Sequence, residues 1–115
     1  MAIVNTKLTL TAVDGLLVPG GKSYAVTNIL VCNNGPSDAT FDMHLVPSGS
    51  PIDNAVTRVI NNLTLPAAET FSFDSEKIVL EAGDRVIFVA EPQSQEPTAQ
   101  VGDTDLATTI SYLEV

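Results

Sequence analysis

Several residue types are scarce in this sequence, and each scarcity excludes a class of function. The 115 residues include no Trp, one Cys and one His. Cys32 has no second cysteine to pair with, so no disulfide can form within the chain, and its apolar neighbours predict a small buried hydrophobic residue. His44 has no second His to join it, which makes a poor transition-metal site. Its place among alternating polar residues predicts an exposed side chain.

Positive charge is also scarce. Five Lys and Arg stand against 14 Asp and Glu, for a net charge of −9. The basic residues are scattered, whereas a nucleic-acid binder needs a basic patch, so we expect no nucleic-acid partner. An anionic bilayer would repel the chain, and no apolar window approaches the ~18 residues of a membrane helix, so we expect no membrane partner. Residues 1–7 lack a signal-peptide pattern, which predicts synthesis and retention in the cytoplasm.

The stretch from Ser23 to Val46 carries the clearest structural pattern. Its second half alternates Phe41, Met43 and Leu45 with polar residues, which is typical of a half-buried strand. Its first half is rich in β-branched residues, and the loop Asn33–Asp38 between the halves consists of turn-forming residues. The stretch therefore predicts two antiparallel strands joined by a tight loop.

Short apolar or alternating segments recur about every ten residues along the rest of the chain. We expect strands at 6–12, 16–18, 23–33, 39–46, 63–65, 69–73, 78–80, 85–90 and 106–115, with turns at 13–15 and 81–84 and a break at 61–62. Residues 52–60 favour an irregular or short helical segment, with an edge strand over 56–60 as the alternative. The spacing predicts an all-β fold: one domain, 1–115, built as an antiparallel β-sandwich, jelly-roll-like or Ig-like, of about eight short strands. The predicted core comprises Leu30, Phe41, Met43, Leu45, Phe71, Phe73, Val86, Phe88 and Ile110.

No pattern of catalytic residues stands out. No G-x-S-x-G occurs, and no serine lies in a segment with a plausible base, so we expect no enzymatic activity and no cofactor. Asp103 and Asp105 are the nearest approach to a calcium site, because two carboxylates one residue apart can share a hard cation. They lack the ligand spacing of an EF-hand, so we expect no metal.

Three polar loops carry acidic residues and are candidates for partner contact. The loops are Asn33–Asp38, Pro47–Asp53 and Glu91–Asp105, and their acids are Asp38, Asp53, Glu91, Glu96, Asp103 and Asp105. Solubility does not require acids to gather in loops. We therefore expect at least one of these loops to dock on a basic patch of a neighbouring protein.

Four segments resemble those of small structural proteins of tailed bacteriophages. They are Leu17–Asn33 (LVPGGKSYAVTNILVCN), Leu65–Thr70 (LPAAET), Val79–Val86 (VLEAGDRV) and Thr109–Val115 (TISYLEV), in the same order. The resemblance implies a β-sandwich virion component: a capsid decoration or cement protein, or a neck, tail or fibre subunit.

The same resemblance implies partners and a location. The expected partners are the major capsid protein or tail and neck proteins, the expected location is the virion, and the expected state is a homo-oligomer such as a trimer. The alternative is a tail, fibre or spike module that binds host surface glycan. That role needs exposed aromatic side chains, and only Tyr24 and Tyr112 accompany four Phe.

Overall fold

The computed structural model describes residues 2–8, 12–73, 78–90 and 106–115, and within them it contains nine β-strands and no helix. These residues therefore include no helix that is long and apolar enough to cross a membrane. The strands are β1 (Ala2–Lys7), β2 (Val13–Leu17), β3 (Tyr24–Asn33), β4 (Ala39–Val46), β5 (Arg58–Leu65), β6 (Thr70–Phe73), β7 (Ile78–Leu80), β8 (Arg85–Ala90) and β9 (Leu106–Glu114). The all-β prediction is confirmed.

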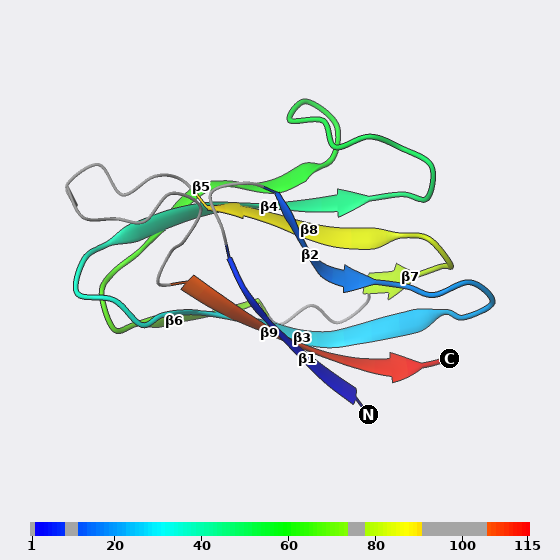
Figure 1. Ribbon diagram of the computed structural model, residues 1–115, viewed down its shortest axis with the longest axis horizontal. Coiled ribbons are helices and arrows are strands. Elements are labelled where there is room, and N and C mark those ends of the chain that lie inside the picture. The colour runs from blue at the N-terminus through cyan, green and yellow to red at the C-terminus, as the bar shows by residue number, and fades with distance from the viewer. Residues whose placement is uncertain (1, 9–11, 74–77, 91–105) are drawn as a thin grey trace.

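The strands form two antiparallel sheets that pack face to face (Figure 1). Sheet A has the order β1-β9-β3-β6, with β7 pairing the other half of β3, and sheet B has the order β2-β8-β4-β5. Rolling up one long hairpin brings its early and late strands together in pairs. The pairs here are β1–β9, β2–β8, β3 with β6 and β7, and β4–β5. This is the strand order of a jelly roll, so the predicted β-sandwich is confirmed.

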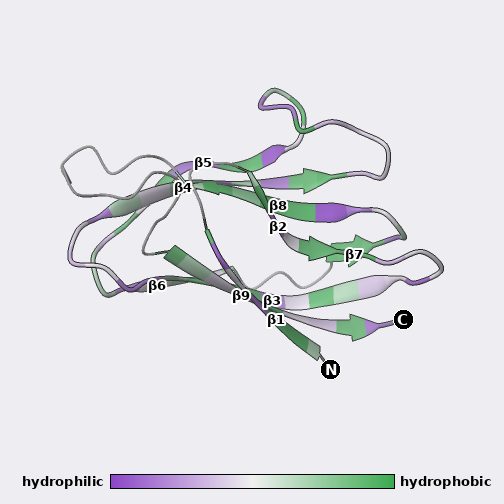
Figure 2. Cartoon of the chain, viewed as in Figure 1, coloured by the Kyte–Doolittle hydropathy of each residue, from purple (hydrophilic) through white to green (hydrophobic). Residues whose placement is uncertain are grey.

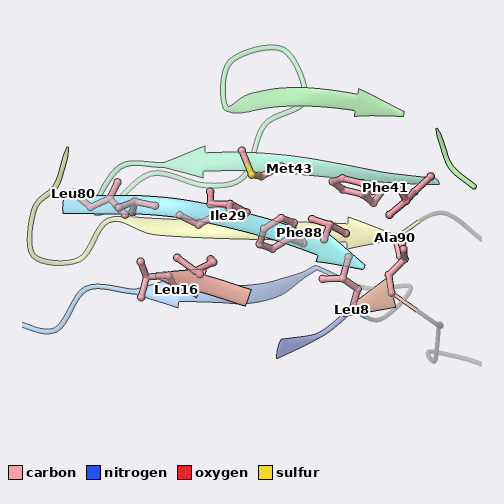
Figure 3. Packing of buried hydrophobic residues seen from close by; sticks show 14 of the residues in the cluster. Leu8, Leu16, Ile29, Phe41, Met43, Leu80, Phe88 and Ala90 are labelled. Carbon is pink, nitrogen blue, oxygen red and sulfur yellow. The ribbon is translucent and has the colours of Figure 1, made fainter. Parts of the chain in front are cut away.

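The core lies between the sheets, where Phe88 of β8 lies beside Phe41 and Met43 of β4 in sheet B, opposite Ile29 of β3 in sheet A (Figure 3). Phe41, Met43, Phe88 and Ile110 are completely buried. Five predicted core residues are confirmed as buried: Phe41, Met43, Val86, Phe88 and Ile110. Three more pack against the core while staying half-buried: Leu45, Phe71 and Phe73.

The prediction for Leu30 is wrong, because a bulge in β3 reverses the side-chain alternation. Val26 pairs with Tyr112 and Asn28 pairs with Ser111, so Thr27 is an extra residue on β3. Val26 before the bulge and Ile29 after it both point into the core. Leu30 therefore lies on the outer face and is half-buried. Cys32 lies on the same outer face, so it is half-buried and not buried as predicted.

A second bulge explains the residues expected to break the chain at 61–62. β5 is continuous, but Phe41 pairs with Leu63 while Met43 pairs with Ile60, so two residues of β5 face one residue of β4. Asn62 adopts a φ of 52°, which Asn tolerates better than most residues. Residues 52–57 are irregular and include a turn at 54–57, so the prediction of irregular structure for this part is confirmed and the helical one is wrong. Strand structure begins at Arg58, so the alternative of an edge strand over 56–60 is correct for 58–60.

Two expectations near the N-terminus also change. The first strand begins at Ala2, four residues before the predicted start, and residues 9–11 lie outside the described part of the chain. Residues 13–15 belong to β2 and do not form the predicted turn. Gly15 is the extra residue of a bulge in β2, opposite β8. At the β7–β8 turn, Gly83 has a φ of 87°, as the sequence predicted for a Gly there.

Candidate interaction surfaces

The structure separates the acidic residues that the sequence singled out. The β3–β4 connection, which includes Asp38, lies at the left end of the sandwich in Figure 1, whereas the β4–β5 connection, which includes Asp53, lies at the opposite end. Both side chains are exposed. The two residues cannot belong to one docking patch. Glu91, Glu96, Asp103 and Asp105 lie outside the described residues, although the strands on either side of that segment, β8 and β9, end and begin at the Asp38 end.

Asp53 has a structural role in its own loop. Its Oδ1 accepts a hydrogen bond from Ala55 N at 2.8 Å, and its carbonyl accepts from Thr57 N at 2.8 Å. The carboxylate therefore fixes the turn that leads into β5, as Asp side chains often do. Asp53 is thus a structural residue first, and a weaker candidate for partner contact than Asp38.

The Asn33–Asp38 loop is held by Asn33, whose side chain is completely buried. Its Nδ2 donates to the carbonyls of Ser37 at 2.8 Å and Leu65 at 3.0 Å, and its Oδ1 accepts from Gly35 N at 3.0 Å. Two of these hydrogen bonds close the loop on itself, and the third, to Leu65, joins it to the end of β5. The loop therefore presents Asp38 from a fixed backbone.

His44 and Asp42 are buried, so the predicted exposure of His44 is wrong. Both side chains point to the outer face of sheet B, but the 47–57 loop lies over that face: Arg85 donates to the Ser50 carbonyl at 3.1 Å, and His44 Nδ1 lies 2.9 Å from Thr57 Oγ1. His44 is 1% exposed. The alternation along the strand was correct, but the loop that directly follows β4 folds back over its polar side.

Each polar group of this buried cluster has a partner. Thr57 Oγ1 accepts from Asp53 N and donates to the Asp53 carbonyl, both at 2.9 Å, so His44 donates to Thr57 from Nδ1. Asp42 Oδ1 accepts from Asn62 N at 2.6 Å, and Oδ2 lies 3.7 Å from Arg58. Burial lowers the pKa of His44, and nearby Asp42 opposes that shift. At neutral pH the imidazole is therefore neutral and acts as a structural donor.

The outer face of sheet A is built from five strands. Directly paired residues of neighbouring strands point to the same side, so the pairing register gives its members. β9 contributes Ala107, Thr109, Ser111 and Leu113, and β3 contributes Ala25, Asn28, Leu30 and Cys32. β1 contributes Ile3, Asn5 and Lys7, and the edge strands contribute Thr70, Ser72 and Val79. We call these residues the sheet A face.

The sheet A face is almost free of charge, with Lys7 as its one charged member. In Figure 2 the deepest hydrophilic colour lies mainly on β5, at strand ends and in the connecting loops. One edge of the face is apolar, because Val79 and Leu113 pair with Ala25 from either side. Val79 is 56% exposed, and Ile3 is 62% exposed. Exposed apolar side chains and a near absence of charge therefore occur together on this face.

Polar groups on the sheet A face bond one another. Thr109 Oγ1 donates to Asn5 Oδ1 at 2.7 Å, and Thr27 Oγ1, in the β3 bulge, donates to the Ser111 carbonyl at 3.1 Å. Covering a hydroxyl that already has a partner costs less than covering one that only water satisfies. The sequence predicted the strand over 106–115, which supplies the β9 positions of this face. It missed β1, whose Ile3–Asn5–Lys7 alternation was the available signal.

The described residues contain no group of three or more His, Cys, Asp and Glu placed to hold a metal ion. Two hollows at described residues measure about 100 and 170 Å³, the larger beneath the 47–57 loop. Both are smaller than the ~300 Å³ at which small-molecule sites begin. Tyr24 and Tyr112, the candidates for sugar stacking, stack on each other at 4.3 Å, and Tyr24 is 8% exposed.

No family model, curated protein or solved structure matches the chain. The surfaces described above are therefore the basis for assigning a role.

Proposed function

We propose that this chain is a non-enzymatic structural protein of a tailed-phage virion, specifically a decoration or cement protein of the capsid. The observation that carries the proposal is the sheet A face, which spans five strands and is nearly uncharged in a chain of net charge −9. A surface of this kind suits lasting contact with a neighbouring protein. Jelly rolls serve widely as capsid modules, although the fold alone does not fix a function.

The four phage-like segments coincide with turns and strands of the fold. Three of them contain the positive-φ positions Gly21, Ala68 and Gly83, at 78°, 64° and 87°. Each of these positions lies in a connection between two strands. The resemblance therefore concerns how the chain turns from strand to strand, and it supports membership of this structural group more than a particular site.

Attachment to the particle is proposed to use the acidic loops at the end that carries Asp38. An acidic loop docks on a basic patch mainly through exposed ion pairs, which are screened over ~8 Å at physiological salt. Mixing the purified chain with particles that lack it, followed by sedimentation, measures the attached copies. We expect many copies per particle and fewer as salt rises.

A pair of variants tests the Glu91–Asp105 loop. Replacing Asp103 and Asp105 with Asn is expected to weaken attachment severalfold with little change in melting temperature. The control combines Asp14→Asn with Glu114→Gln, which gives the same net charge, removes exposed carboxylates elsewhere, and is expected to attach like the wild type. Equal behaviour of the two variants would refute docking through this loop. Absence of any attachment would refute the structural role.

The glycan-binding alternative receives no comparable support. Among the described aromatic residues, the two tyrosines cover each other, and the four Phe lie in or against the core. No described aromatic pair is therefore free to stack on a sugar ring. Retention of the chain on immobilised host glycans would favour the alternative over attachment to the capsid.

A further inference from the structure

We infer that the sheet A face pairs with the same face of a second copy of this chain, related by a two-fold axis. The inference rests on the proposed function, which requires a neighbouring protein at this face. It deepens that proposal by naming the neighbour. The inferred dimer differs from the trimer expected from the sequence. A face that pairs with the same face of a second copy requires a two-fold axis, whereas a ring of three copies needs two different patches on each chain.

Charge is the first argument for a second copy. Each chain carries a net charge of −9, so two copies repel over most orientations. On the sheet A face the one charged residue is Lys7, which lies at the end of β1. Two chains can therefore approach through this face without bringing carboxylates together. A basic partner would instead be drawn to the acidic loops.

Area is the second argument. Four neighbouring strands spaced ~4.8 Å apart, with nine residues of β9 at ~3.4 Å each, cover roughly 20 by 30 Å, or about 600 Å². A standard interface buries ~800 Å² of accessible surface per partner. Two such faces together give about 1,200 Å², which is the lower end of the ~1,200–2,000 Å² that specific interfaces bury in total.

Chemistry is the third argument. Val79, Ala25 and Leu113 form an apolar row across three strands, while Thr109 and Asn5 satisfy each other through their hydrogen bond. The apolar row gains free energy when it is covered, and the bonded polar pair loses little. The mixture suits a face that stays soluble in the single chain and associates with its own kind.

The test measures the mass of the isolated chain by sedimentation velocity over a wide range of concentration. We expect a reversible monomer–dimer equilibrium that strengthens as salt rises, because salt screens the repulsion between two acidic chains. This sign is opposite to that expected for docking through the acidic loops. A monomer at all concentrations, or a trimer, would overturn the inference.

Matched variants locate the contact. Val79→Glu places a carboxylate on the sheet A face, where the residue is 56% exposed, and Val59→Glu makes the same change on β5 of sheet B, where the residue is 51% exposed. The two-fold axis doubles the effect of the first change, so we expect it to weaken pairing tenfold or more. The second should leave pairing within about twofold.

A second pair repeats the comparison, with Leu113→Glu on the face and Leu17→Glu on β2. Circular dichroism and melting curves must show that all four variants fold. Equal weakening by face and control variants would overturn the inference. The outcome is separate from the proposed function: an isolated chain that stays monomeric yet attaches to particles refutes the pairing alone, and a dimer that never attaches refutes the virion role alone.

Discussion

Gly15 offers a test of the core in which backbone propensity and packing predict opposite signs. It is the extra residue of the β2 bulge and points toward Phe88. A Cβ added at Gly15 would lie 2.5 Å from Phe88 Cε2, 2.8 Å from Cδ2 and 3.3 Å from Ile110 Cδ1. The first two distances are too short for any carbon–carbon contact, so Gly15→Ala must displace a ring that fills the centre of the sandwich.

The magnitude follows from two opposing terms. Replacing Gly by Ala within a strand stabilises by roughly 0.5–1 kcal/mol, because Gly loses more backbone freedom on folding. Overpacking a full core costs about 1–3 kcal/mol, because neighbouring side chains leave their preferred rotamers. The packing term is larger at this site, so we expect Gly15→Ala to lower the free energy of unfolding by about 1–2 kcal/mol.

Urea unfolding measures this change, with Gly20→Ala as the control, since a Cβ at Gly20 meets nothing within 4 Å. The control should be neutral or slightly stabilising. In a Phe88→Leu background the ring edge is gone, so Gly15→Ala should become neutral or stabilising there. If Gly15→Ala stabilised the wild-type chain, the proposed contact between β2 and Phe88 would be wrong.

Three further predictions test the bulges and the buried cluster. Ile29→Ala should lower the free energy of unfolding by about 2–4 kcal/mol and Leu30→Ala by less than about 1 kcal/mol, because the β3 bulge points Ile29 into the core and Leu30 outward. Equal losses in urea unfolding would contradict the bulge. Asp42→Ala should cost about 1–3 kcal/mol by leaving Asn62 N without its partner, measured the same way, and a neutral result would remove that role. Burial lowers the pKa of His44 below its ordinary 6.5, so as the pH falls below 6.5 the unfolded chain binds a proton that the folded chain does not, and stability drops. His44→Asn should lose less stability than the wild type between about pH 7 and pH 5, and identical pH profiles would contradict the assignment.

Alternation and turn residues were sufficient to predict the sandwich. The pattern of Phe41 and Met43 placed β4 correctly, and the Gly of the β7–β8 turn has the positive φ expected of it. These signals are local, because a strand's side-chain period and a turn's φ depend on neighbouring residues alone. They identify the strands without fixing which face of each strand is covered.

The errors came from features that depend on distant residues. Leu30 was assigned to the core because nothing in the β3 sequence marks the bulge at Thr27, which exists through its pairing with β9. His44 was assigned to solvent because the alternation along β4 does not show that the following loop, residues 47–57, folds back over that face of the sheet. The part of the sheet A face that β9 contributes is indicated by the alternation of Thr and Ser along that strand. The complete face required the sheet order, which joins the N-terminal and C-terminal strands.

The most direct test of the proposed role is to purify virus particles from the source of this chain and to look for the chain in them. Quantitative mass spectrometry gives its copy number relative to the major capsid protein, and a cryo-electron-microscopy map of the same particles locates it. We expect a high, symmetry-related copy number, with jelly-roll density on the outside of the shell. Particles that lack the chain, or that carry only a few copies confined to fibre tips, would contradict the assignment as a capsid decoration protein.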